Sequence, residues 1–169
     1  MSRRRYPLSV ATLFRDGLDL RYEVTGSGPP LLLPELNFPW DGPVVDALAE
    51  RFTVVVASPR GFMASGRLAA TADYVVADMA GDVVAAVNEA GFERFFVLGY
   101  LVDDLPCPLF AFWGDDDEEI GQAGGTQGLA DGLRARGLQH TSFPGLDHEG
   151  MLARIAEAVP AVLAWFEEL

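Results

Sequence analysis

The sequence contains no lysine, and all 12 of its basic side chains are arginines. Aspartate and glutamate number 25, so the formal net charge is −13. A surface with this much negative charge repels the phosphate backbone of nucleic acids. We therefore expect no nucleic-acid partner and consider a small molecule as the substrate or ligand.

Cysteine and histidine are scarce as well. The single cysteine, Cys107, cannot form an internal disulfide, and the two histidines do not combine with it into a Cys/His metal site. We expect neither a metal nor a cofactor. Nothing in the sequence requires an oxidising compartment, so the expected location is the cytoplasm.

Long apolar runs are also missing. None approaches the roughly 20 residues that cross a membrane. The basic start, Met1–Pro7, lacks the apolar core of a signal peptide and is interpreted as a short solvated tail. Half of the 169 residues are hydrophobic, which predicts a single globular domain over residues 1–169 that does not bind a membrane.

The N-terminal half predicts a hairpin followed by buried strands. Val10–Phe14 and Leu18–Val24 alternate polar and apolar residues around Asp16-Gly17, a strong hairpin signal. Gly26–Pro30 is a turn cluster. Short apolar runs predict strands at Leu31–Leu33 and Thr53–Ala57, with a short helix at Pro43–Arg51 between them.

The C-terminal half predicts alternating helices and strands. Helices are expected at Thr71–Ala90, Gln127–Arg136 and Glu149–Leu169. Thr71 or Asp73 would cap the first helix, Gly91 would end it, and Pro160 would kink or restart the last. The first helix should turn a core-facing stripe inward, formed by Val75, Val76, Met79, Val83, Val84 and Val87. Strands are expected at Phe95–Leu98, Leu109–Trp113 and Gln139–Phe143. The predicted fold is α/β, with a mostly parallel sheet flanked by helices and an N-terminal antiparallel hairpin.

One connection conflicts with this fold. Two adjacent parallel strands need a crossover of about a dozen residues or more, usually containing a helix. The link between Phe95–Leu98 and Leu109–Trp113 is shorter and carries prolines and acidic residues. Either the two strands are not parallel neighbours, or an intervening unit is missing near residues 100–106.

Candidate chemistry lies in the loops that follow the predicted strands, where open α/β sheets bind ligands. His148 follows Gln139–Phe143, and Asp115, Asp116 and Asp117 follow Leu109–Trp113. A histidine oriented by a carboxylate can act as a general base. The structural alternatives are a His148 that caps or packs beside Asp147 and a solvated acidic loop.

Other candidates have simpler interpretations. His140 lies within a predicted strand and is interpreted as a packing or surface residue. Ser58 and Ser65 are expected to form hydrogen bonds within their loop, and Cys107 is expected to be buried.

The order of these segments resembles the α/β-hydrolase family. Gly26–Pro30 before Leu31–Leu33 resembles the entry to the family's third strand, and Arg60-Gly-Phe-Met-Ala-Ser65 is similar to its Asp-x-Arg-Gly-x-Gly-x-Ser loop, with Ser58 replacing the Asp and Met63 the second Gly. Phe96–Tyr100 resembles the strand before the nucleophile elbow. The resemblance implies that Asp117 is the catalytic acid and His148 the catalytic histidine.

The chain departs from the family at the nucleophile. Leu101 follows Gly99-Tyr100 where the family usually has Ser, and leucine cannot attack an electrophile. The elbow helix, the next strand and the cap region have no counterpart. Where the family often has His-Gly, this chain has Pro34–Asn37, so the resemblance assigns an oxyanion-binding amide to Leu36 or Asn37.

Three hypotheses follow. The chain is an internally shortened hydrolase whose parent cleaved an ester or related bond with a Ser-His-Asp triad, and is itself almost inactive in nucleophilic catalysis. Alternatively, it is a non-catalytic protein that binds a small molecule or a second copy of itself, as a homodimer formed by strand exchange. In a third hypothesis, His148 and Asp117 act on water without a covalent intermediate.

Overall fold

The computed structural model describes residues 9–36, 40, 42–70, 73–99, 110–118, 120 and 124–168, without the side chain of Leu152. The chain divides into two compact units, Met1–Gly99 and Tyr100–Leu169, each of which is described by itself. The single domain that the sequence predicts therefore stays a prediction.

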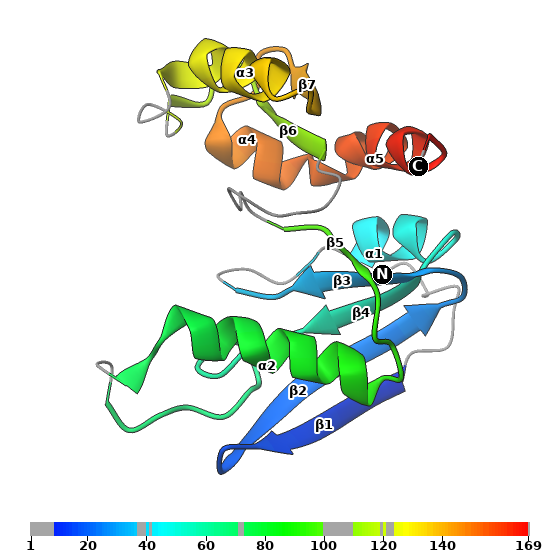
Figure 1. Cartoon of the computed structure of the whole chain (residues 1–169), viewed down its shortest axis with the longest axis vertical. Coiled ribbons are helices and arrows are strands. Elements are labelled where there is room, and N and C mark those ends of the chain that lie inside the picture. The colour runs from blue at the N-terminus through cyan, green and yellow to red at the C-terminus, as the bar shows by residue number, and fades with distance from the viewer. Residues whose placement is uncertain are drawn as a thin grey trace. The chain divides into compact units, whose positions relative to one another are not determined.

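The first unit is built on a five-stranded sheet in the order β1-β2-β4-β3-β5 (Figure 1). Its strands are β1 (Ser9–Arg15), β2 (Leu18–Gly26), β3 (Pro30–Pro34), β4 (Thr53–Ala57) and β5 (Phe96–Val97). The two pairings of β3 are parallel, whereas β1–β2 and β2–β4 are antiparallel. The prediction of a mostly parallel sheet is therefore wrong for this unit, which is mixed. Helices α1 (Gly42–Leu48) and α2 (Val76–Glu89) supply the crossovers of the two parallel pairings, whereas β2 pairs with β4 in the antiparallel direction.

The predicted hairpin is present. Leu13 faces Leu20 and Arg15 faces Leu18 across the ribbon. Its two turn residues, Asp16 and Gly17, have φ angles of 51° and 81°. Positive φ at both positions belongs to the two-residue turn whose twist matches a β-ribbon, and Asp-Gly adopts it readily.

Helix α1 (Gly42–Leu48) connects β3 to β4, and α2 (Val76–Glu89) connects β4 to β5. Helix α2 packs on one face of the sheet (Figure 1), where it shares an apolar cluster of Tyr22, Leu32, Val55, Ala57, Val83, Ala86 and Val87. The helix stops before Gly91, as predicted, and Gly91 takes the left-handed φ of 95°.

The predicted start and stripe of α2 are only partly correct. The helix begins at Val76 after an N-cap at Val75 without a side-chain cap, so Asp73 does not cap it, and Thr71 lies outside the described residues. Val83 and Val87 are buried, but Val75, Val76 and Val84 are exposed. Val75 and Val76 lie where the helix starts, and Val84 lies about 100° around the helix from Val83, away from the sheet.

The second unit pairs two parallel strands, β6 (Phe110–Gly114) and β7 (Gln139–Phe143), connected by α3 (Gly125–Ala135). Beyond β7 the expected single helix Glu149–Leu169 is instead three pieces, α4 (His148–Ala153), a 3-10 turn (Ile155–Ala158) and α5 (Val159–Phe166). Pro160 lies in the first turn of α5, where its missing N–H costs nothing. The predicted restart at Pro160 is confirmed, but the continuous helix is wrong.

Each of the two apolar runs on either side of the short link pairs within its own unit. Among the described strands, β5 pairs with β3 and β6 pairs with β7. The argument that the link is too short to join parallel neighbours stays a prediction. The missing unit predicted near residues 100–106 falls outside the described residues.

Within the ranges given above, no helix has the length and apolar character needed to cross a membrane. The same residues contain no group of three or more His, Cys, Asp or Glu side chains arranged to hold a metal ion.

Candidate acid–base site

The second unit brings together His148 and Asp117, the two catalytic residues that the resemblance implies. His148 Nδ1 lies 3.0 Å from Asp117 Oδ2. The Asp117 side chain is 6% exposed and the His148 side chain 34% exposed. Because a carboxylate oxygen accepts, Nδ1 donates, which places the lone pair of the neutral ring on Nε2. A buried acid thus orients a histidine that is partly open to solvent.

Backbone hydrogen bonds fix the loop after β6 against the loop after β7. Asp115 N–H donates to Phe143 O at 3.1 Å, and Asp116 N–H donates to Leu146 O at 3.0 Å. In return, Gly145 N–H donates to Asp115 Oδ1 at 2.7 Å. Asp115 therefore holds the loops together, while Asp117 orients the histidine. This separates two roles that the sequence left open among three adjacent aspartates.

Gly114, the last residue of β6, allows this close approach. A Cβ at this position would lie 2.1 Å from Leu146 O, which is far inside van der Waals contact. The two loops could not keep their present separation with any larger residue at Gly114.

His148 is the first residue of α4. Asp147 precedes it and caps the helix, because its Oδ1 accepts the Gly150 N–H at 2.7 Å. The Asp147 carbonyl accepts the Met151 N–H at 2.9 Å. Asp147 is therefore the cap, and the side chain of His148 is directed to Asp117 instead.

The predicted oxyanion residues belong to the first unit of the chain, whereas His148 and Asp117 belong to the second. Leu36 lies in the first unit, in the loop after β3, and is partly exposed. Asn37 lies outside the described residues, as do Tyr100, Leu101 and Cys107. Oxyanion binding by Leu36 or Asn37 stays a prediction.

The remaining candidates behave as the sequence suggests. Ser58 donates to Glu35 Oε2 at 2.7 Å, and Ser65 donates to Ser58 O at 2.6 Å while accepting the Arg21 N–H at 2.8 Å. His140 stacks on Trp113, with ring centroids 5.4 Å apart. These side chains support the structure.

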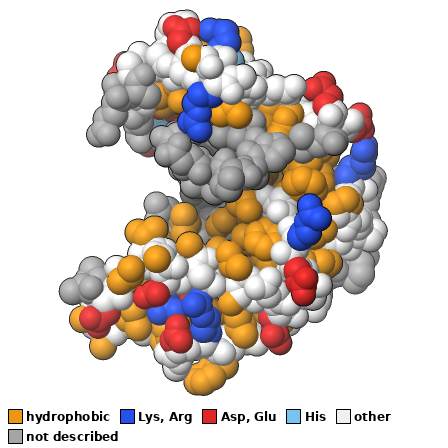
Figure 2. All heavy atoms as spheres, viewed as in Figure 1, with side chains coloured by type: hydrophobic (Ala, Val, Ile, Leu, Met, Phe, Trp, Pro, Cys, Tyr) orange, Lys and Arg blue, Asp and Glu red, His pale blue; other side chains and the backbone are white. Residues whose placement is uncertain are grey.

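Sequence analysis missed a buried ion network in the first unit. Arg60 lies in the loop after β4 and contacts Asp82 in α2. Its Nε donates to Asp82 Oδ2 and its Nη2 donates to Asp82 Oδ1, each at 2.7 Å. Arg15 and Asp16 of the hairpin join it, at 2.8 Å from Asp82 and from Arg60 respectively. Figure 2 shows basic and acidic side chains grouped around the hairpin turn and α2. The only sequence signal was Asp82, a charge beside apolar residues on the inner side of a helix.

Burial on its own raises the pKa of Asp82, but hydrogen bonds from the Arg60 side chain and backbone prevail and lower it. The side-chain hydrogen bonds that Arg60 donates to Asp82 and to Asp16 raise the pKa of Arg60. Both groups are therefore charged at neutral pH, and together they fix the Ser58–Gly66 loop to α2.

No protein-family model matches the sequence. The chain is similar to Epoxide hydrolase 3 of Siraitia grosvenorii, with 26% identity over 93 residues, 53% of this chain and 29% of that protein. A solved structure of a putative epoxide hydrolase from Pseudomonas aeruginosa is 35% identical with a TM-score of 0.50, over 57% of this chain and 34% of that one. Epoxide hydrolase VrEH1 from Vigna radiata is 20% identical with a TM-score of 0.47, over 53% and 30%.

This chain spans about a third of the length of these relatives. At that coverage, the similarity supports an α/β-hydrolase type of protein at a coarse level.

Proposed function

We propose that the chain retains the acid–base part of an α/β-hydrolase site and lacks its nucleophile. The observation that supports this is the contact between His148 Nδ1 and Asp117 Oδ2 at 3.0 Å. A partly exposed histidine oriented by a buried carboxylate is the arrangement that general-base catalysis requires.

In the proposed reaction, His148 Nε2 takes a proton from water. The resulting hydroxide attacks an electrophilic carbon of the substrate, forming one C–O bond as the C–O bond to the leaving oxygen breaks. The imidazolium returns its proton to that oxygen, which restores the neutral ring. Asp117 holds the ring and stabilises its positive charge while the proton is there.

Leu101 explains why no covalent step is included. It occupies the place where the family has its nucleophile, and its side chain has no lone pair. We propose that the parent protein had a full Ser-His-Asp triad with an oxyanion-binding amide near Leu36 or Asn37. A unit carrying the nucleophile is then missing near residues 100–106.

Among substrates with an ester or related C–O bond, we prefer epoxides as the substrate class. This choice is based on the names of two similar proteins, which are epoxide hydrolases. A strained three-membered ring also suits the proposal physically, because ring strain lowers the barrier to attack by water without covalent catalysis. We therefore propose slow hydrolysis of small epoxides to diols.

The test is hydrolysis of styrene oxide by the chain, by His148→Ala and by a control variant of the other histidine, His140→Ala. Removing a general base should lower the rate by about a hundredfold. The ring of His140 stacks on Trp113 and its Nδ1 lies 3.4 Å from Leu138 O, so His140→Ala should keep the rate within about twofold if circular dichroism shows it folded. Equal rates for the chain and for His148→Ala would refute the proposal.

A second candidate is a non-catalytic protein that forms a homodimer by strand exchange. What favours it is that, within the described residues of the first unit, β5 is the edge strand of the five-stranded sheet and pairs with β3 on one side. Val97 of β5 is also 53% exposed. Unpaired strand edges readily pair with another chain. Light scattering at rising concentration should show twice the chain mass, and a monomer at all concentrations would remove this candidate.

A further inference from the structure

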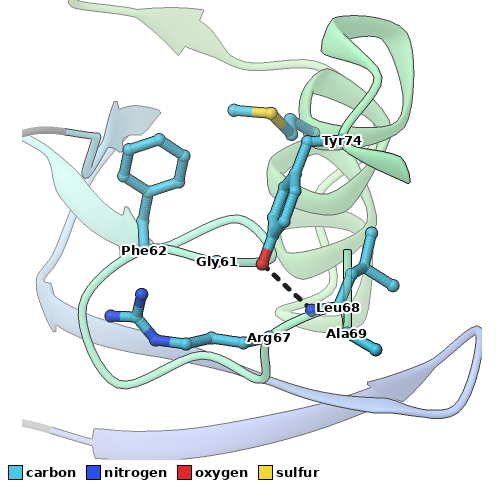
Figure 3. Close-up of a pocket in the computed structure, with 7 residues that line it drawn as sticks. Gly61, Phe62, Arg67, Leu68, Ala69 and Tyr74 are labelled. Carbon is cyan, nitrogen blue, oxygen red and sulfur yellow. Dashed lines mark hydrogen bonds between the residues drawn. The ribbon is translucent and has the colours of Figure 1, made fainter. Parts of the chain in front are cut away.

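The first unit contains a pocket that the proposed hydrolysis does not use. It has a volume of about 400 Å³ and is lined by Gly61, Phe62, Arg67, Leu68, Ala69, Tyr74 and Met79. In Figure 3, the rings of Phe62 and Tyr74 stand on opposite sides, and the Arg67 side chain runs along the lower edge. Two aromatic walls and one cation thus surround the same space.

One aromatic wall is held in place before any ligand binds. The Tyr74 hydroxyl accepts the Leu68 N–H at 2.9 Å (Figure 3). The ring also packs on bare backbone, because a Cβ on Gly61 would lie 2.3 Å from Tyr74 Cε1. Gly61 has a φ of 85°, which other residues rarely adopt. A wall fixed in this way needs little ordering when a ligand binds.

The cation of the pocket differs from its neighbour in the same loop. Arg60 is neutralised by Asp82 and Asp16. Arg67 is exposed, and none of the described acidic side chains forms an ion pair with it. In a chain with a net charge of −13, this leaves a guanidinium available for an anion at the edge of an apolar pocket.

We propose that this pocket binds a small organic carboxylate with a flat apolar body. The guanidinium of Arg67 presents two parallel N–H donors that match the two oxygens of a carboxylate. Phe62 and Tyr74 offer ring faces for the flat body, and Leu68, Ala69 and Met79 complete the apolar lining. A bare inorganic anion would leave these walls unused.

The probe is sodium benzoate, titrated into the whole chain and followed by the backbone amide signals of Gly61 and Leu68 in NMR spectra. Acetate lacks the ring and benzyl alcohol lacks the charge, so each should bind at least about tenfold more weakly than benzoate. Saturable binding of benzoate alone supports the proposal. Equal affinity for benzoate and benzyl alcohol contradicts it.

Two variants locate the site. Arg67→Gln should raise the Kd for benzoate about tenfold, and Arg67→Lys should restore part of the affinity. Arg94→Gln is the matched control, since it removes one exposed positive charge of the same unit outside the pocket, and should leave the Kd within about twofold. Ala69→Phe, at an exposed position, should fill the pocket and abolish binding. Benzoate binding that survives both Arg67→Gln and Ala69→Phe would overturn the proposal.

Discussion

Asp82→Asn should destabilise the first unit more than any other single neutralisation of a described carboxylate. The Asp82 side chain is 0% exposed and accepts hydrogen bonds from the Arg60 backbone, the Arg60 guanidinium and Arg15. In the variant, the 6%-exposed Arg60 keeps its buried charge and the amide turns a donor toward it. Breaking a buried ion pair by removing one partner costs about 3–5 kcal/mol.

The lower end of that range applies here, because Asp16 still contacts Arg60 at 2.8 Å. We expect a loss of about 3 kcal/mol in the free energy of unfolding, measured by urea denaturation with circular dichroism. Asp78→Asn is the matched control on the same helix: Asp78 is 51% exposed and 4.0 Å from Arg60, so its loss should stay below about 1 kcal/mol. If Asp82→Asn costs no more than Asp78→Asn, the ion network does not stabilise the fold as argued.

The pH dependence of this stabilisation follows from the sign of the shift. The pKa of Asp82 is lowered in the folded chain from its ordinary value of 3.8. Its contribution is therefore fully present above that value and is lost as the pH falls through the lower, folded-state pKa. The difference in stability between the chain and Asp82→Asn should be constant near neutral pH and shrink below pH of about 4. A difference that grows on acidification would contradict the assignment.

Three further predictions concern glycine positions. Met63 has a φ of 44°, and the family that the sequence resembles has glycine at this position. Met63→Gly should therefore raise the free energy of unfolding by about 0.5–1 kcal/mol in urea denaturation. A decrease would show that Met63 is not strained. Gly114→Ala should push the loop after β7 away from β6, lower the free energy of unfolding by about 1–3 kcal/mol and shift the NMR signals of the His148 ring. Unchanged signals would refute the argument that the two loops approach closely at Gly114. Gly132→Ala in α3 meets nothing within 4 Å and should instead stabilise by about 0.5–1 kcal/mol, and a loss would show an unseen steric conflict.

Local patterns predicted those parts of the fold that depend on neighbours in the sequence. Thr53–Ala57 and Gln139–Phe143 form strands with the predicted bounds, and Asp16-Gly17 forms the predicted turn. The predicted start of α2 was wrong. Val75 and Val76 fit the helical spacing of the apolar residues, but they lie where the helix begins and remain exposed. Periodicity describes a helix face but does not tell where the supporting sheet ends.

The acid–base pair and the buried ion network also differed in how far the sequence predicted them. The position of these residues after two strands whose carboxyl ends meet at one edge of a sheet predicted that one of Asp115, Asp116 and Asp117 lies beside His148, and the resemblance to the α/β-hydrolase family implied Asp117. The ion network around Asp82 joins Arg60 to Asp82, 22 positions apart, and Arg15 to Asp82, 67 positions apart. Asp16 lies 44 positions from Arg60 in the same network. Such contacts depend on the packing of α2 against the hairpin, and no spacing within a helix or strand encodes them.

The proposal that water attacks the substrate directly is tested most directly by one turnover of styrene oxide in ¹⁸O-labelled water. Mass spectrometry then measures the label in the diol and in the protein. Attack by water activated at His148 predicts one ¹⁸O atom in the diol from the first turnover and none in the protein. An unlabelled first diol, with ¹⁸O in a carboxylate of the chain, would reveal a covalent intermediate and contradict the account.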